Sequence, residues 1–211
     1  MNTYLFDFDG TLVDSMPTYG SCMLRILDDC QVPYESDLLK IITPLGCLGT
    51  VKYYQDVLGV TRSQDELLEM MYKYMFEEYA YHIPAKENVV SVLQQLKEQG
   101  AGLNVLTASP HITLDPCLKR LGLWDLFDNV WSCNDFNTTK SDPEIYRMAA
   151  EKIGQPIEKI IFLDDNYNAD LTAKEVGMIV YGVYDDTSRE YVDEIKSITD
   201  RYIFDFTELL S

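Results

Sequence analysis

The 211-residue sequence predicts an α/β protein: a doubly wound, Rossmann-like parallel sheet with a small all-helical cap domain. Three observations lead to this fold class. Short apolar runs of strand length alternate with longer segments of helical periodicity. Glycines follow most of the helical segments, where helix stop signals are expected. One long interval near the amino terminus breaks the alternation, because it contains helical patterns only.

The predicted strands are continuous apolar runs without polar alternation, which is typical of a parallel sheet covered by helices on both faces. We expect five strands, at residues 4–8, 103–107, 130–133, 160–163 and 179–183. The helices predicted between and after them span residues 87–99, 114–121, 143–153 and 169–176. Pro143 after Asp142 is a favourable helix start.

The helical interval divides the chain into two predicted domains. We expect an α/β core formed by residues 1–14 and 85–211, and a helical cap formed by residues 15–84. Apolar residues recur in the cap at helical spacing and predict the seam of a helix bundle: Leu67, Leu68, Met71, Met75 and Tyr79. The segment 43–50 contains proline and glycine and is predicted to be a loop.

Composition restricts the partners. The formal net charge of −18 would repel nucleic acid and anionic membrane surfaces, so neither is an expected partner. Five cysteines without a Cys-x-x-Cys pair indicate reduced thiols. No apolar run approaches the roughly 18 residues of a membrane span, and we expect a cytoplasmic protein. The sequence leaves the oligomeric state open.

Polar side chains gather where the predicted strands end, and ligands of such sheets bind at the carboxyl ends of the strands. The candidate site residues are the polar Asp7, Asp9, Thr107, Lys140, Asp164, Asp165 and Asp170, together with Ala108 next to Thr107. Residues two apart on a strand point the same way, so we expect Asp7 and Asp9 to be presented together. A single acid at a strand end is commonplace, but this ordered set indicates a catalytic site.

Converging carboxylates require a cation, since two like charges 4 Å apart cost on the order of 4 kcal/mol at an effective dielectric near 20. Donors that are all oxygen favour a hard ion, and Mg2+ also bridges to substrate phosphate. We expect Asp7, Asp9, Asp164 and Asp165 as metal ligands, with Asp170 in a supporting position.

Phosphoryl transfer requires a nucleophile, an acid/base and stabilisation of the phosphoryl oxygens. We expect Asp7 to attack phosphorus and form an aspartyl-phosphate. Asp9 is expected to protonate the leaving oxygen and then to deprotonate water. Thr107, Ala108 and Lys140 are the expected phosphate-binding residues.

The motifs carrying these residues resemble those of the haloacid dehalogenase (HAD) superfamily: Asp7-Phe8-Asp9-Gly10-Thr11-Leu12-Val13-Asp14-Ser15, Leu106-Thr107-Ala108-Ser109, Lys140 before Asp142-Pro143, and Phe162-Leu163-Asp164-Asp165-Asn166. The helical insertion directly after the first motif resembles the phosphoglycolate-phosphatase-like branch. The resemblance implies a Mg2+-dependent phosphatase whose cap selects a small phosphorylated metabolite. Asp164 stands where a glycine is frequent, and Ser141 interrupts a frequent Lys-Pro pair.

Alternative functions remain open. The nearest is a phosphomutase of the same fold, similar to beta-phosphoglucomutase, which returns the phosphoryl group to substrate. A dehalogenase needs neither a metal nor the second acid, so Asp9 argues against it. A phospho-signalling receiver would place its acidic pair first and would lack the insertion, and an inactive binding protein would not need the full set of acids. His82 and His111 are interpreted as structural.

Overall fold

The computed structural model describes residues 2–211, without the side chain of Pro44, and the chain divides into two compact units. One unit consists of Met1–Asp14 and Pro84–Ser211, and the other of Ser15–Ile83. We call them the core unit and the helical unit. No helix among the described residues is both long and apolar enough to cross a membrane.

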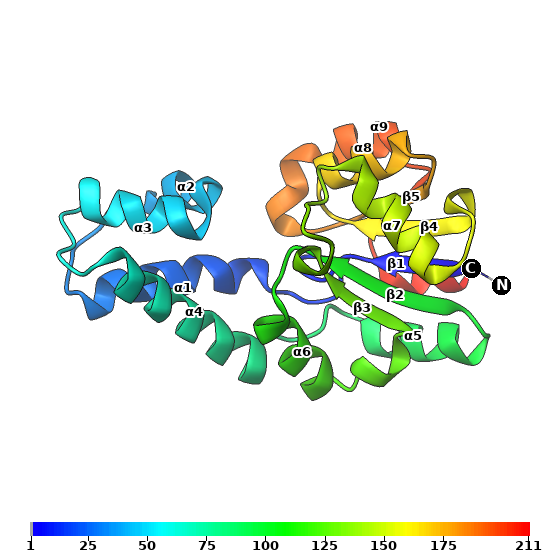
Figure 1. Cartoon of the computed structure of the whole chain (residues 1–211), viewed down its shortest axis with the longest axis horizontal. Helices are drawn as coiled ribbons and strands as arrows, with labels where there is room; N and C mark the ends of the chain where they lie inside the picture. The colour runs from blue at the N-terminus through cyan, green and yellow to red at the C-terminus, as the bar shows by residue number, and fades with distance from the viewer. Residues whose placement is uncertain (1) are drawn as a thin grey trace. The chain divides into compact units, whose positions relative to one another are not determined.

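The core unit is built on a parallel sheet of six strands in the order β3-β2-β1-β4-β5-β6 (Figure 1). The strands are β1 (Thr3–Phe6), β2 (Gly102–Thr107), β3 (Asn129–Ser132), β4 (Ile160–Asp164), β5 (Ile179–Val183) and β6 (Arg201–Ile203). β1 is central, and Thr3 is in register with Gly102 on one side and with Ile160 on the other. The predicted fold class is confirmed.

Helices cover both faces of this sheet (Figure 1). They are α5 (Val89–Glu98), α6 (His111–Arg120), α7 (Pro143–Ile153), α8 (Tyr167–Glu175) and α9 (Val192–Ile198), with short 3-10 turns η2 (Trp124–Leu126), η3 (Cys133–Phe136), η4 (Ile157–Lys159), η5 (Asp186–Tyr191) and η6 (Phe206–Leu210). Successive strand residues face opposite layers. Leu5 packs in a cluster with Tyr146 of α7 and Ala173 of α8, whereas Phe6 stacks on Phe206 of η6 with ring centroids 6.2 Å apart.

Local signals explain why α7 occupies the predicted range 143–153. The side chain of Asp142 accepts a hydrogen bond from the backbone N–H of Glu144 at 2.9 Å, so it caps the helix start. Pro143 fits the first helical position because it needs no intrahelical donor there. Gly154 ends the helix with φ +74°, a left-handed conformation that favours glycine.

Two expectations about the sheet need correction. β1 ends at Phe6 rather than at residue 8, because the backbone turns at Gly10 and Asp7 pairs only with the neighbouring strand β4. The sixth strand, β6, was not predicted. It is only three residues long, and its Arg201 and Tyr202 lack the apolar character of the other strands.

The helical unit contains α1 (Met16–Asp29), α2 (Leu38–Ile42), η1 (Thr43–Leu45), α3 (Gly46–Asp56) and α4 (Gln64–Tyr81), and none of the six strands. α4 begins with a capping box, in which Ser63 and Glu66 satisfy each other's backbone donors. The predicted seam on α4 is buried at Leu67, Met71, Met75 and Tyr79 and half-buried at Leu68, so these residues form the core of this unit.

The predicted loop at 43–50 is wrong, since this segment is helical in η1 and the start of α3. A proline is compatible with the first turn of a helix, and Gly46 makes the change of direction between the two helices with φ +64°. Thr50 is fully buried, and its hydroxyl donates to the Ile42 carbonyl at 3.0 Å. Burial of Val51 and Tyr54 then holds α3 in the bundle.

Candidate active site

The candidate site lies at the carboxyl ends of β1 and β4. Asp7 directly follows β1, and its backbone N–H donates to the Leu163 carbonyl at 2.8 Å, which extends the strand pairing by one residue. Asp164 ends β4, and Asp165 follows it. The parallel register therefore brings these three acids to one edge of the sheet.

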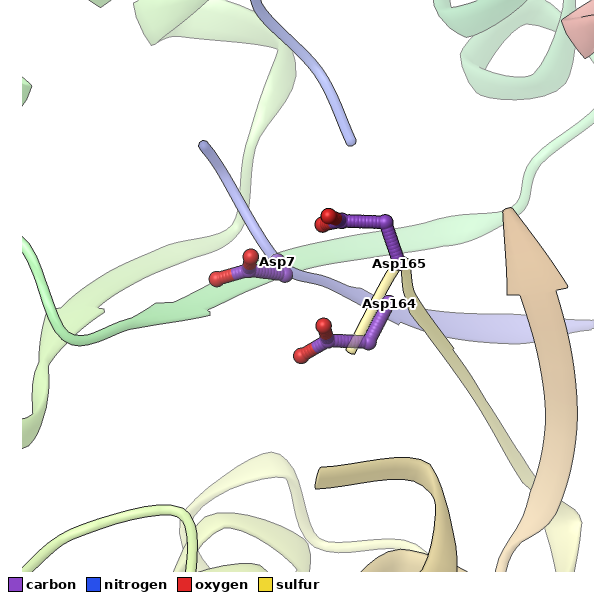
Figure 2. A group of neighbouring side chains, drawn as sticks. All are labelled: Asp7, Asp164 and Asp165. Carbon is purple, nitrogen blue, oxygen red and sulfur yellow. The ribbon is translucent and has the colours of Figure 1, made fainter. Parts of the chain in front are cut away.

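Asp7, Asp164 and Asp165 form what we call the acid cluster. One carboxylate oxygen from each lies within 4.8 Å of the other two, and all three residues are buried. Figure 2 shows the three side chains projecting in the same direction from the ends of the two strands. Such a concentration of buried negative charge requires a counter-charge.

Lys140 supplies part of that counter-charge. Its Nζ lies 2.7 Å from Asp7 Oδ1 and 2.7 Å from Asp164 Oδ2. Burial lowers the pKa of Lys140, but Asp164 and Asp7 outweigh it and hold the pKa well above its ordinary value. The lysine is therefore a permanent cation between the two acids.

One lysine does not neutralise the acid cluster. Burial raises the pKa of Asp7 from its ordinary 3.8 to about 7, against the lowering effect of Lys140 and with a further increase from Asp164. Burial and the charges of Asp164 and Asp7 also raise the pKa of Asp165 well above its ordinary range. Burial and the neighbouring negative charges thus favour the neutral form of both carboxyl groups.

Asp170, in the first turn of α8, is fully buried, and neither of its carboxylate oxygens has a hydrogen-bond partner among the described residues. Burial raises its pKa well above the ordinary value, and Asp164 and Asp165 raise it further. Buried carboxylates without partners are costly, and a nearby cation or a metal-bound water would remove that cost.

The donor set fits Mg2+. The acid cluster offers only oxygen ligands, at a partly neutralised site with one orphaned carboxylate beside it. Asp7, Asp164 and Asp165 could hold the ion, and Asp170 lies close enough to Asp164 and Asp165 for their charges to act on it. The carboxylate of Asp9 does not join this cluster.

Asp9 instead contacts the segment after β2. Its Oδ2 accepts a hydrogen bond from the Ser109 hydroxyl at 2.5 Å, and the side chain is half-buried. The Ser109 backbone N–H donates to Thr107 Oγ1 at 3.0 Å, while Ala108 is exposed. Asp7 and Asp9 thus have different partners, Lys140 and Ser109, while the charge of Asp9 still acts on Asp7 and raises its pKa.

The turn after β1 packs directly on the acid cluster. Gly10 has φ +74°, and a Cβ at this position would lie 2.7 Å from Asp165 Oδ2, so only glycine fits. The Thr11 hydroxyl donates to Asp165 Oδ1 at 3.3 Å. Backbone and side chain of this turn together fix the position of Asp165.

Sequence reasoning gave no role to Thr11, Lys86 or Ser109, which all contact this region. Their contacts join residues distant in sequence and follow no periodic pattern, although Thr11 and Ser109 lie inside the motifs. The two histidines lie at helix ends. His82 is the C-cap residue of α4, and His111 is the first residue of α6. The His111 Nδ1 lies 2.7 Å from Asp115 Oδ1, and its Nε2 lies 2.8 Å from Asp135 Oδ2.

This geometry defines an α/β protein with a buried acid cluster at the carboxyl end of its central strand. Residues 1–177 match the haloacid dehalogenase-like hydrolase family, and the chain belongs to that family.

Among curated relatives, the pyrophosphatase PpaX of Bacillus velezensis is 29% identical over 182 residues, covering 85% of this chain and 81% of the relative. A phosphorylated carbohydrates phosphatase of Thermotoga maritima is 24% identical, and the match covers 87% of this chain and 85% of the relative. A solved structure, CbbY from Rhodobacter sphaeroides in complex with phosphate, superposes with a TM-score of 0.80 at 19% identity, covering 99% and 96%. The structural likeness supports the fold.

Proposed function

We propose that this protein is a Mg2+-dependent phosphatase that hydrolyses a small phosphorylated metabolite through an aspartyl-phosphate on Asp7. The observation that carries the proposal is the pairing of Asp7 with Lys140 inside a buried acid cluster that fits a metal. Relatives named as a pyrophosphatase and as a phosphorylated carbohydrates phosphatase support this reaction class.

Each residue has a separate role in this reaction. Asp7, Asp164 and Asp165 would hold Mg2+, which would supply positive charge for the phosphoryl oxygens. Lys140 keeps the Asp7 carboxylate in place and offsets its charge, so that it can approach an anionic phosphate. An oxygen of Asp7 forms a bond to phosphorus as the bond from phosphorus to the leaving oxygen breaks.

Asp9 then moves protons. It donates a proton to the departing oxygen, and afterwards removes one from the water that attacks the phosphorus of the aspartyl-phosphate. This second step releases inorganic phosphate and restores the Asp7 carboxylate. The Ser109 hydroxyl holds the Asp9 side chain by the 2.5 Å hydrogen bond, and Thr107 Oγ1 is a phosphate-binding group next to it.

The two units have different roles in the proposed function. Every residue with a chemical role lies in the core unit, within Met1–Asp14 and Pro84–Ser211. We propose that residues 15–84 act as the cap that selects the substrate. The bundle core of this segment leaves its surface side chains available for that purpose.

We expect the purified protein to release inorganic phosphate from a generic aryl phosphate only when Mg2+ is present. Chelation should abolish turnover, and added Mg2+ should restore it, because the acid cluster would otherwise repel the phosphate dianion. A screen of phosphorylated metabolites for phosphate release then identifies the substrate. Formation of an isomeric sugar phosphate without phosphate release would replace this proposal by a phosphomutase, and full activity in chelator would contradict the metal.

We expect Mg2+ to bind more weakly as the pH falls through about 7, since the pKa of Asp7 is raised to about 7 in the metal-free protein. Below that value the metal must displace a proton, which weakens binding by about tenfold per pH unit for each proton displaced. Calorimetric titration with Mg2+ at pH 6, 7 and 8 measures this. Equal affinity at pH 6 and 8 would contradict the coupling.

The same pKa shift acts on stability. The folded-state pKa of Asp7 exceeds the ordinary value of 3.8, so the folded state binds more protons between about 4 and 7. Stability of the metal-free protein should therefore fall as the pH rises through this window, and saturating Mg2+ should oppose the fall.

A further inference from the structure

Lys86 lies in the segment by which the chain returns to the core unit. Its backbone N–H donates to the Leu12 carbonyl at 3.0 Å, and the Asp14 N–H donates to the Pro84 carbonyl at 3.0 Å. Val13 and Ala85 form an antiparallel bridge between these contacts. The main chain thus holds Lys86 beside the turn that follows β1.

The Lys86 ammonium has three acceptors. Its Nζ donates to the Gly10 carbonyl at 2.7 Å, to the Tyr184 carbonyl at 2.6 Å and to Asp185 Oδ2 at 3.1 Å. A lysine ammonium carries three protons, so every donor is used. The side chains of Lys86 and Asp185 are 19% and 5% exposed, which makes this a largely buried ion pair. Lys86 therefore ties the turn after β1 to the segment after β5.

The tied turn is the one that packs on the acid cluster. Gly10 leaves no room for a Cβ against Asp165, and Thr11 donates to the same carboxylate. A displacement of the Gly10 backbone would therefore change the position of the Asp165 carboxylate. The carbonyl that Lys86 binds belongs to that same glycine.

We propose that Lys86 is a positioning residue for the metal site: by fixing the Gly10 carbonyl to the segment after β5, it holds Asp165 in the orientation that binds Mg2+. This inference rests on the proposed function, because it assumes the metal. The positive charge of Lys86 has the opposite effect on Mg2+ affinity, because it offsets the negative charge of Asp185. Without Lys86, the unpaired Asp185 would add negative charge close enough to act on Asp165, and would strengthen the attraction for Mg2+.

Loss of the positioning contact should weaken Mg2+ binding, whereas loss of the Lys86 charge should strengthen it. Calorimetric titration of the metal-free protein with MgCl2 at pH 8 distinguishes the two without relying on turnover. We expect Lys86→Met to weaken Mg2+ binding by at least about tenfold, as loss of an outer-shell partner typically does. The double variant Lys86→Met with Asp185→Asn removes the freed charge but leaves the Gly10 carbonyl without its donor. It should bind Mg2+ at least as weakly as the single variant, because the charge that favours the ion has been removed as well.

Lys97→Met is the matched control. Lys97 also forms an ion pair, with Asp128 at 2.5 Å, but it lies in the last turn of α5, just before the amino end of β2. Its Mg2+ affinity should stay within about twofold of the wild type, because a partly exposed pair contributes little beyond its own contact. Thermal unfolding without Mg2+ shows whether each variant is folded. Should Lys86→Met be unfolded, Lys86→Gln replaces it and must also bind Mg2+ more weakly.

Three results would overturn the inference. Binding by the Lys86 variant as tight as or tighter than that of the wild type would show that position does not depend on Lys86. Recovery of wild-type affinity in the double variant would show that the loss does not come from the position of the Gly10 carbonyl, which lacks its donor in both variants. Absence of Mg2+ binding by the wild type would contradict the metal site and the proposed function. The first two results would contradict only the role of Lys86, so the two kinds of failure are distinguishable.

Discussion

Asp7→Asn is expected to reduce phosphate release by at least about a thousandfold, because an amide cannot form the acyl-phosphate bond on which both half-reactions of the proposed mechanism depend. The change keeps the shape of the side chain and removes a buried charge whose pKa is already raised to about 7. The folded state should therefore survive, and turnover at saturating Mg2+ measures the loss. Intact-mass spectrometry should find the phosphoryl adduct in slowed variants such as Asp9→Ala, and none in Asp7→Asn.

Asp125→Asn is the control for this substitution, since Asp125 is exposed in η2, before the amino end of β3. It should keep wild-type turnover. Wild-type turnover in Asp7→Asn would rule out the covalent mechanism, and a phosphoryl adduct on the Asp7→Asn protein would place the nucleophile elsewhere.

Lys140→Met is expected to lower both turnover and stability. It leaves Asp7 and Asp164 buried without the cation that lies 2.7 Å from each. Breaking a buried ion pair typically costs about 3 kcal/mol, and we expect a loss of that order in the free energy of unfolding at pH 8 without Mg2+. The loss should be smaller at pH 5, where protonation of Asp7 removes one of the unpaired charges. Turnover should fall by at least about a hundredfold.

Chemical denaturation at the two pH values and steady-state kinetics measure these effects. Lys159→Met is the control, because Lys159 is exposed and directly precedes β4, at the opposite end of the strand that carries Asp164. It should change neither quantity appreciably. Lys140→Arg should retain much of the stability, since it keeps the charge. A Lys140→Met protein as stable as the wild type at pH 8 would contradict the counter-charge role.

The approach of Asp7, Asp164 and Asp165 could be predicted from the sequence, because one rule about parallel sheets covers them: strand ends of the same polarity share an edge. Lys140 lies beyond β3 and η3, and its place in the order of the motifs indicated that it belongs to the same site. The helix at 143–153 was equally predictable, since Asp142, Pro143 and Gly154 mark its ends locally. These features depend on short-range signals or on a general property of the fold.

The remaining features depend on where backbones turn. Asp9 lies outside the acid cluster because β1 ends at Phe6. The sequence does not mark this end, since Phe8 is apolar like the strand residues before it. Ser109 reaches Asp9 across 100 residues, and Lys86 reaches Gly10 across 76. No periodicity marks such contacts, so a single sequence could not reveal them. The helix in the segment 43–50 was missed for a related reason, since burial of Thr50 outweighs the local proline and glycine.

The chain leaves the core unit after Asp14 and returns at Pro84, where two backbone hydrogen bonds of 3.0 Å join the two segments, from Asp14 to Pro84 and from Lys86 to Leu12. A module whose two ends meet at one point places no demand on the length or shape of the sheet that carries it. Its sequence can diverge, or a different module can be grafted in its place, without moving the acid cluster or Lys140. Under the proposed function, substrate recognition can thus change while the reaction is conserved.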